Sequence, residues 1–136
     1  MPSDAPEGFK PFRQAGAFAD LTGPIYYKKL DDGGFAYGFR IDDKHLNPND
    51  VVHGGMLFTF ADQFIGRAVV AETKRYCATI KLNVEFLAPG KNGDWIEGRS
   101  ETMRITRDLA YMRGRVMSGH HTLMTAQGIW RLFAPY

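Results

Sequence analysis

The sequence has one cysteine, no long apolar run and no large excess of charge of either sign. The single thiol, Cys77, excludes an internal disulfide and a multi-thiolate metal site, which favours a reducing compartment. With 17 basic and 15 acidic residues, the charge is too balanced for a dedicated nucleic-acid-binding protein. No apolar run reaches the ~18 residues of a membrane span, because the most apolar stretch contains Asp62 and Arg67. With no signal-peptide pattern at the N-terminus, we expect a cytoplasmic protein without membrane or nucleic-acid partners.

The length of 136 residues and the hydrophobic share of 44% fit one domain with a real core. Residues 1–22 mix prolines and glycines with three phenylalanines. That mixture fits a short helix whose aromatics face the body, and it fits a loosely ordered lead-in equally well. We therefore divide the chain into an N-terminal extension, residues 1–22, and a main domain, residues 23–136.

Hydrophobic periodicity predicts one buried helix among six strands. Residues 56–71 are apolar on nearly every side, and a helix of that kind must be buried. Short turn sequences separate the segments that follow, which favours antiparallel pairing. The order β-β-α-β-β-β-β indicates an α+β fold, an antiparallel sheet of about five to six strands wrapped round the helix. The predicted strands cover residues 25–30, 35–41, 77–87, 95–106, 109–118 and 122–133.

Such a half-open sheet leaves strand edges and one flank of the helix uncovered. Long edge strands invite pairing with another copy of the chain. We expect a homodimer or a larger assembly, and a strictly monomeric species at micromolar concentration would contradict this expectation.

The sequence His53-Gly54-Gly55 marks the start of the predicted helix. The first N–H groups of a helix lack intrahelical partners, and the macrodipole makes them attractive to negative charge. Since glycine has no Cβ, Gly55 N–H could hold a carbonyl oxygen that becomes an oxyanion. Each of these residues also has a purely structural explanation. The glycines would allow a tight loop-to-helix turn, His53 would cap the helix, and Asn47 would be a turn residue.

Asp62 lies inside the apolar helix, where an unpaired carboxylate costs free energy. Asp62 and neighbouring polar residues form a narrow polar stripe along one side of the helix. Such a stripe fits the edge of a water-filled cleft or a contact between subunits. Asp62 is a candidate general base. The alternative is a structural ion pair with Arg67 or Lys81.

Helical periodicity connects these two features with assembly. His53 and Asp62 are nine positions apart, which places them ~13 Å apart along the axis and on opposite sides of a helix. One chain cannot readily bring Gly55 N–H and the Asp62 carboxylate to the same carbonyl, whereas two antiparallel helices side by side can. If both groups act on one substrate, the site spans a dimer interface.

Asn47, His53-Gly54-Gly55 and Asp62, within this strand order, resemble the hotdog-fold acyl-CoA thioesterases, in particular the branch that includes the phenylacetate-pathway thioesterases. The resemblance covers about residues 24–133. It implies a long helix wrapped by an antiparallel sheet, dimers formed edge to edge and often paired into tetramers. It also implies that Gly55 N–H polarises the thioester carbonyl and that Asp62 of the partner subunit is the base or nucleophile.

The same resemblance implies roles for the remaining candidates. Asn47 and His53 would place water and the thiolate leaving group, and Thr79 would lie opposite the acid. Gly54 and Gln63 would contact substrate, with Gln63 bearing on substrate choice rather than on the reaction. The CoA nucleotide needs cations, for which Lys91, Arg107 and Arg113 are candidates, although each is also typical of solvated surface charge.

The expected function is hydrolysis of an acyl- or aryl-CoA thioester without a metal or redox cofactor. No His, Asp or Glu set has the spacing of metal ligands. Two alternatives stay open: an acyl-thioester dehydratase or hydratase, and a non-catalytic acyl-CoA-binding protein. The products separate them, since hydrolysis releases free thiol and hydration alters a double bond.

Overall fold

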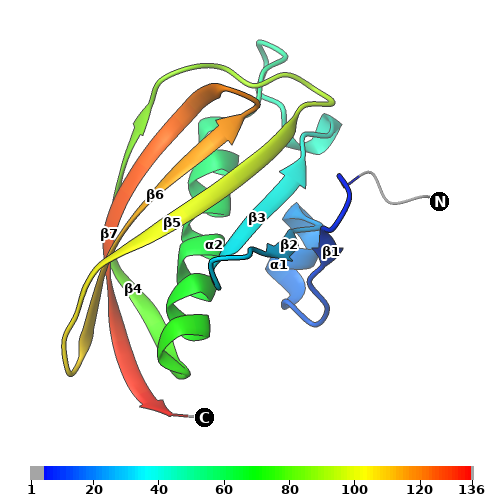
Figure 1. Cartoon of the computed structure of the whole chain (residues 1–136). Coiled ribbons are helices and arrows are strands. Elements are labelled where there is room, and N and C mark those ends of the chain that lie inside the picture. Colours follow the sequence, from blue (N-terminus) through cyan, green and yellow to red (C-terminus); the bar gives the residue numbers. More distant parts are fainter. Residues whose placement is uncertain (1–4, 136) are drawn as a thin grey trace.

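A seven-stranded antiparallel sheet curves round one long helix, α2 (Gly54–Thr73), in a computed structural model that describes residues 5–135 (Figure 1). The strand order is β1-β2-β3-β5-β6-β7-β4, and the predicted α+β architecture is confirmed. The two further helices are short: α1 (Ala17–Thr22) and the 3-10 helix η1 (Asp43–His45). The strands are β1 (Lys10–Pro11), β2 (Tyr26–Lys29), β3 (Phe35–Arg40), β4 (Arg75–Phe86), β5 (Trp95–Ile105), β6 (Leu109–Ser118) and β7 (His121–Pro135).

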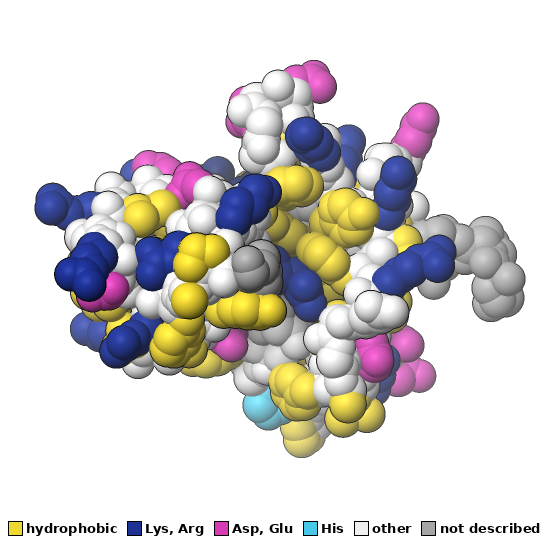
Figure 2. Space-filling view, turned by 90° about the horizontal axis from the view of Figure 1, so that it is seen from below, with side chains coloured by type: hydrophobic (Ala, Val, Ile, Leu, Met, Phe, Trp, Pro, Cys, Tyr) yellow, Lys and Arg dark blue, Asp and Glu magenta, His cyan; other side chains and the backbone are white. Residues whose placement is uncertain are grey.

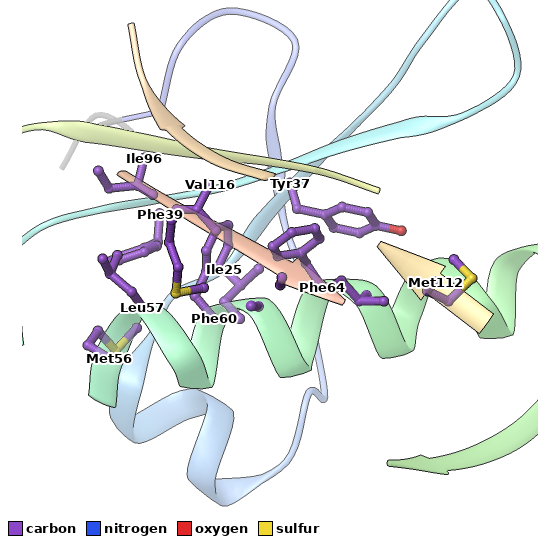
Figure 3. Packing of buried hydrophobic residues seen from close by; sticks show 14 of the residues in the cluster. Ile25, Tyr37, Phe39, Met56, Leu57, Phe60, Phe64, Ile96, Met112 and Val116 are labelled. Atoms are coloured by element: carbon purple, nitrogen blue, oxygen red, sulfur yellow. The ribbon is translucent and has the colours of Figure 1, made fainter. Parts of the chain in front are cut away.

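The apolar residues of α2 form the centre of the core. Phe60, Phe64 and Ile65 are fully buried, and Figure 3 shows the two phenylalanine rings packed beneath the strands. Burial of one such side chain stabilises the fold by roughly 1.5–3 kcal/mol. The sheet can lie close to the helix because Gly98 of β5 has no side chain, and a Cβ there would come within 2.6 Å of the Phe64 ring. These contacts fix the position of α2 against the sheet.

No helix within residues 5–135 combines the length and the apolar character that a membrane crossing requires.

The N-terminal extension is part of the same sheet, because β1 pairs with β2. The idea of three aromatics on one face of a short helix is wrong: α1 contains only Phe18, and that side chain is 61% exposed. Phe9 instead packs edge-on against Trp95, and Phe12 packs against Tyr27 of β2. The two packed rings precede α1, so they attach the extension to the sheet rather than to the helix.

Strand β4 forms one edge of the sheet and is bonded to β7 alone among the described strands. Several large apolar side chains on this strand face solvent, including Ile80, which is 57% exposed, and Phe86. An edge of 12 residues with exposed apolar side chains is the kind that pairs with a second chain. The dimer expected from the sequence stays a prediction, but this is the edge on which it would form.

A buried histidine fastens the loop that precedes α2. His45 is 4% exposed, its Nε2–H donates to Thr22 O at 2.6 Å, and its Nδ1 accepts from Asp42 N–H at 2.9 Å. The carbonyl of His45 accepts from His53 N–H at 2.7 Å. These roles require a neutral imidazole, and burial lowers the pKa of His45, with a smaller contribution from Lys44 and opposing ones from Thr22 and Asp42.

This arrangement predicts how stability depends on pH. Because the pKa of His45 is lowered by folding, its contribution is complete above the unfolded value of about 6.5 and declines as the pH falls below it. A His45→Gln variant should be less stable at pH 7.5, by about 1–3 kcal/mol for the lost hydrogen bonds, yet should lose less further stability by pH 5.5. Urea denaturation at both pH values measures this, and equal pH dependence in the two proteins would contradict it.

Candidate functional site

The start of α2 presents one free amide. His53 is the N-cap, and its Nδ1 accepts from Gly55 N–H at 2.7 Å, so the amide expected to hold an oxyanion is already paired in this chain. Gly54 N–H makes no hydrogen bond within the described residues. The unpaired donor at the positive end of the helix dipole is therefore Gly54, which the sequence placed only as a substrate contact.

Asn47 shapes the loop that leads to this helix start. Its side-chain oxygen accepts from Asn49 N–H at 2.9 Å and from Val51 N–H at 3.4 Å, and its own N–H donates to Val51 O. The side chain thus acts as a turn residue. The side-chain NH₂ group of Asn47 makes no hydrogen bond with any residue that the structure describes. That group is therefore available to a ligand.

Asp62 meets Thr79 across the space between α2 and β4. Thr79 Oγ1–H donates to Asp62 Oδ1 at 2.5 Å. In the described part of the chain no Lys, Arg or His nitrogen lies within 4.0 Å of this carboxylate, so the alternative ion pair with Arg67 or Lys81 is not formed. Asp62 is half-buried and Thr79 is exposed at the free edge. The Asp62 carboxyl group therefore has a hydroxyl partner and no cation partner among the described residues.

A bulge in β4 accompanies this contact. Thr79 pairs with Trp130 whereas Lys81 pairs with Ile129, so the register shifts between them. The neighbouring strand accommodates the shift through Gly128, where a Cβ would lie 2.4 Å from Lys81 O. Bulges re-aim side chains beside functional sites. The sequence pattern did not predict this bulge, whose one signal is a glycine within a strand.

Within one chain, the two candidate catalytic groups, Gly54 N–H and the Asp62 carboxylate, lie far apart. Since α2 is continuous from Gly54 to Thr73, Gly54 and Asp62 are separated by ~12 Å along the axis.

The thiol of Cys77 lies near Asp62, and its pKa is raised by burial and by the Asp62 charge. Cys77 is therefore a packing residue, as expected, rather than a thiolate nucleophile.

A cavity of about 640 Å³ opens beside Asp62, between α2, the start of β4 and the N-terminal segment. Arg67 is the cation in its wall, and its guanidinium lies 4.1 Å from the centre of the Phe12 ring. Figure 2 shows hydrophobic side chains gathered in the hollow at this end of the molecule, with Lys and Arg beside them. Most of the lining is apolar or aromatic: Phe12, Ala15, Ala19, Tyr27, Phe35, Tyr37, Gly66, Val70, Ala71, Cys77, Ala78 and Trp130, together with Asp62, Gln63, Arg67 and Thr79.

The three cations suggested for the CoA nucleotide are not brought together in one chain. Lys91 pairs with Val51, close to the start of α2. Arg107 lies in the turn after β5, at the other end of an 11-residue strand, which spans ~33 Å or more. Arg113 donates to Glu101 at 2.9 Å in an ion pair with an exposed partner. Of the three, Lys91 alone lies near the helix start.

Comparisons with known proteins agree with this geometry. The model of the thioesterase superfamily matches residues 49–125. The Pseudomonas aeruginosa protein named "Putative esterase PA0474" is 30% identical over 131 residues, which cover 95% of this chain and 98% of that protein.

Two solved structures share the fold. The PaaI protein of the E. coli phenylacetic acid degradation operon has a TM-score of 0.79 and 19% identity, covering 88% of this chain and 86% of its own. The BH2602 protein of Bacillus halodurans, solved with CoA, has a TM-score of 0.81 and 23% identity, covering 92% and 83%. The hotdog fold expected from the resemblance is confirmed.

Proposed function

The chain belongs to the thioesterase superfamily, and from this premise we propose that it hydrolyses the thioester of an acyl- or aryl-CoA to a free acid and CoA. The observation that carries the proposal is the Asp62 carboxylate, which is hydrogen-bonded by Thr79 and free of any ion pair among the described residues, beside an apolar cavity. The CoA in the Bacillus halodurans structure supports CoA as the thiol portion.

The chemistry needs a base or nucleophile and a donor for the developing oxyanion. Either the Asp62 carboxylate takes a proton from water as the water oxygen attacks the carbonyl carbon, or it attacks that carbon itself and water opens the resulting anhydride. In both routes the C–S bond breaks and CoA leaves as the thiolate, which then takes a proton. Both need a preorganised N–H at the carbonyl oxygen, and neither needs a metal or redox cofactor.

Gly54 is the better candidate for that donor, because Gly55 N–H already donates to His53 Nδ1. Since Gly54 and Asp62 of one chain are ~12 Å apart along α2, we assign the site to a dimer: Gly54 of one chain acts with Asp62 of the partner subunit. In this arrangement Asn47 and His53 lie by the leaving group, and Lys91, near the same helix start, faces the CoA nucleotide.

If the dimer forms along the free edge of β4, a substitution on that strand should weaken it. An Ile80→Glu substitution puts a charge on the exposed side of β4 and should raise the dimer dissociation constant at least about tenfold, since a charged side chain on an edge strand disfavours its pairing with another chain. The matched control is Met103→Glu, an exposed apolar residue on β5, a strand that β6 and β7 separate from the β4 edge. Sedimentation at micromolar concentration measures both. A wild-type monomer, or an Ile80→Glu dimer of unchanged affinity, would contradict the proposed interface.

The test of the reaction is release of free thiol from short-chain, long-chain and aromatic acyl-CoAs. Turnover establishes hydrolysis and identifies the acyl class. An altered double bond without thiol would indicate a hydratase or dehydratase, and binding without turnover would indicate a carrier or sensor.

A further inference from the structure

The cavity beside Asp62 follows the helix away from the reaction centre. The residues of α2 in its wall recur at a spacing of three to four and form one continuous stripe. Arg67 lies five positions after Asp62, ~7.5 Å further along the helix axis. An acyl group with its carbonyl at Asp62 that fills the cavity therefore extends toward Arg67. The stripe comprises Asp62, Gln63, Gly66, Arg67, Val70 and Ala71.

Two polar groups lie along this path without the partners such groups normally have, and the Tyr37 phenol lies beside them. The Arg67 guanidinium stacks on Phe12, and within the described residues no carboxylate lies within 4.0 Å of it. The side-chain oxygen of Gln63 is buried and lacks a hydrogen bond in the same part of the chain. Burial raises the pKa of Tyr37 to about 12 although the Arg67 charge opposes it, so the phenol keeps its proton.

Aromatic rings line the cavity beside the Arg67 guanidinium and the Gln63 amide. Phe12, Tyr27 and Tyr37 form a wall of rings, with centroids 4.6 Å apart for Phe12 and Tyr27 and 6.0 Å for Phe12 and Tyr37. Figure 3 shows the Tyr37 hydroxyl pointing along α2 past Phe64, away from Met56 and Phe60. A guanidinium and an amide beside an apolar wall gain most from a ligand that pairs with both.

We propose that the substrate's acyl group carries a carboxylate at its far end, which Arg67 binds. This proposal rests on the proposed hydrolase function and names its substrate class: CoA monothioesters of dicarboxylic acids. The Gln63 amide, rotated to present its NH₂, and the Tyr37 hydroxyl supply further donors. A carboxylate held by a guanidinium makes charge-assisted hydrogen bonds, roughly twice as strong as neutral ones. Arg67 is thus a specificity-determining residue, separate from the reacting atoms.

The experiment compares adipoyl-CoA with hexanoyl-CoA, which differ in the terminal carboxylate. Wild-type kcat/KM should be at least about tenfold higher for adipoyl-CoA, the ratio that ~1.4 kcal/mol produces. Arg67→Gln should remove that preference and leave hexanoyl-CoA within about threefold of wild type, while Arg67→Lys should keep part of it. The control is Arg104→Gln, an exposed arginine on β5 outside the cavity. If Arg67→Gln does not fold, Gln63→Leu removes the second proposed donor to the carboxylate and should also lower the preference.

Two results would overturn the inference: a wild-type enzyme without preference for adipoyl-CoA, or an Arg67→Gln variant that slows both substrates equally. Failure of the proposed function looks different, because neither substrate then releases thiol. In that case, calorimetric binding of the two CoA esters to wild type and Arg67→Gln still decides the question. Tighter binding of adipoyl-CoA that requires Arg67 supports the inference, and equal binding of both esters overturns it.

Discussion

Replacement of Asp62 by Asn should lower kcat for thioester hydrolysis at least about 100-fold, the lower range for loss of a general base or nucleophile. The substitution keeps the shape of the side chain, and its oxygen can still accept from Thr79 Oγ1–H. The lost property is therefore the charge that takes a proton or attacks the carbonyl. Thiol release under substrate saturation measures the effect.

A matched control exists on the same helix. Glu72 is an exposed acid of α2 whose carboxylate accepts from Thr102 Oγ1. Glu72→Gln removes the same charge away from the cavity and should leave kcat within about twofold, in the range of an ordinary surface substitution. A folded Asp62→Asn protein with wild-type turnover would end the assignment of Asp62 to the reaction.

Gly54→Pro should lower kcat about 100- to 1,000-fold, the usual loss when one oxyanion donor is removed. Proline removes the amide hydrogen of Gly54 and adds a ring whose Cβ would lie 3.2 Å from Phe86, and it is favourable at the first position of a helix. The preceding residue, His53, has φ −64° and ψ 133°, a conformation that proline accepts. Since Gly54 N–H has no partner among the described residues, the folded chain loses no hydrogen bond.

Gly54→Ala separates the lost N–H from the added side chain. A Cβ at Gly54 would lie 3.2 Å from the ring of Phe86, an exposed side chain that can shift. Alanine adds this contact and keeps the donor, so its kcat should stay within about fivefold of wild type. Equal losses in both variants would point to steric blockage, and a fully active Gly54→Pro enzyme would return the role to Gly55.

The features that followed from sequence are those set by local patterns. The buried helix was predicted from its nearly continuous apolar residues, and the structure extends it by two residues at each end. The succession of the helix and strands β2 to β7 along the chain followed from turn signals between alternating segments. Thr79 was found only through the family resemblance, since a β-branched residue in a strand has no distinguishing pattern of its own.

Other features depend on contacts that sequence spacing does not encode. Whether Gly54 or Gly55 has the free amide depends on the direction of the His53 ring, which side-chain packing decides. The cavity wall forms only when the N-terminal segment folds back and places Phe12 over Arg67, 55 positions later in the chain. The bulge beside Thr79 depends on the close approach of two strands at Gly128.

The most direct test of the shared site mixes two inactive proteins, Asp62→Asn and Gly54→Pro, under conditions that exchange subunits. Half of the resulting two-fold dimers are mixed, and each mixed dimer has one site with both an intact Gly54 and an intact Asp62, so activity should recover to about a quarter of wild type. If each chain held a complete site, the mixture would stay at the residual activity of its components. Native mass spectrometry verifies the exchange, and mixed dimers without recovered activity would contradict the account.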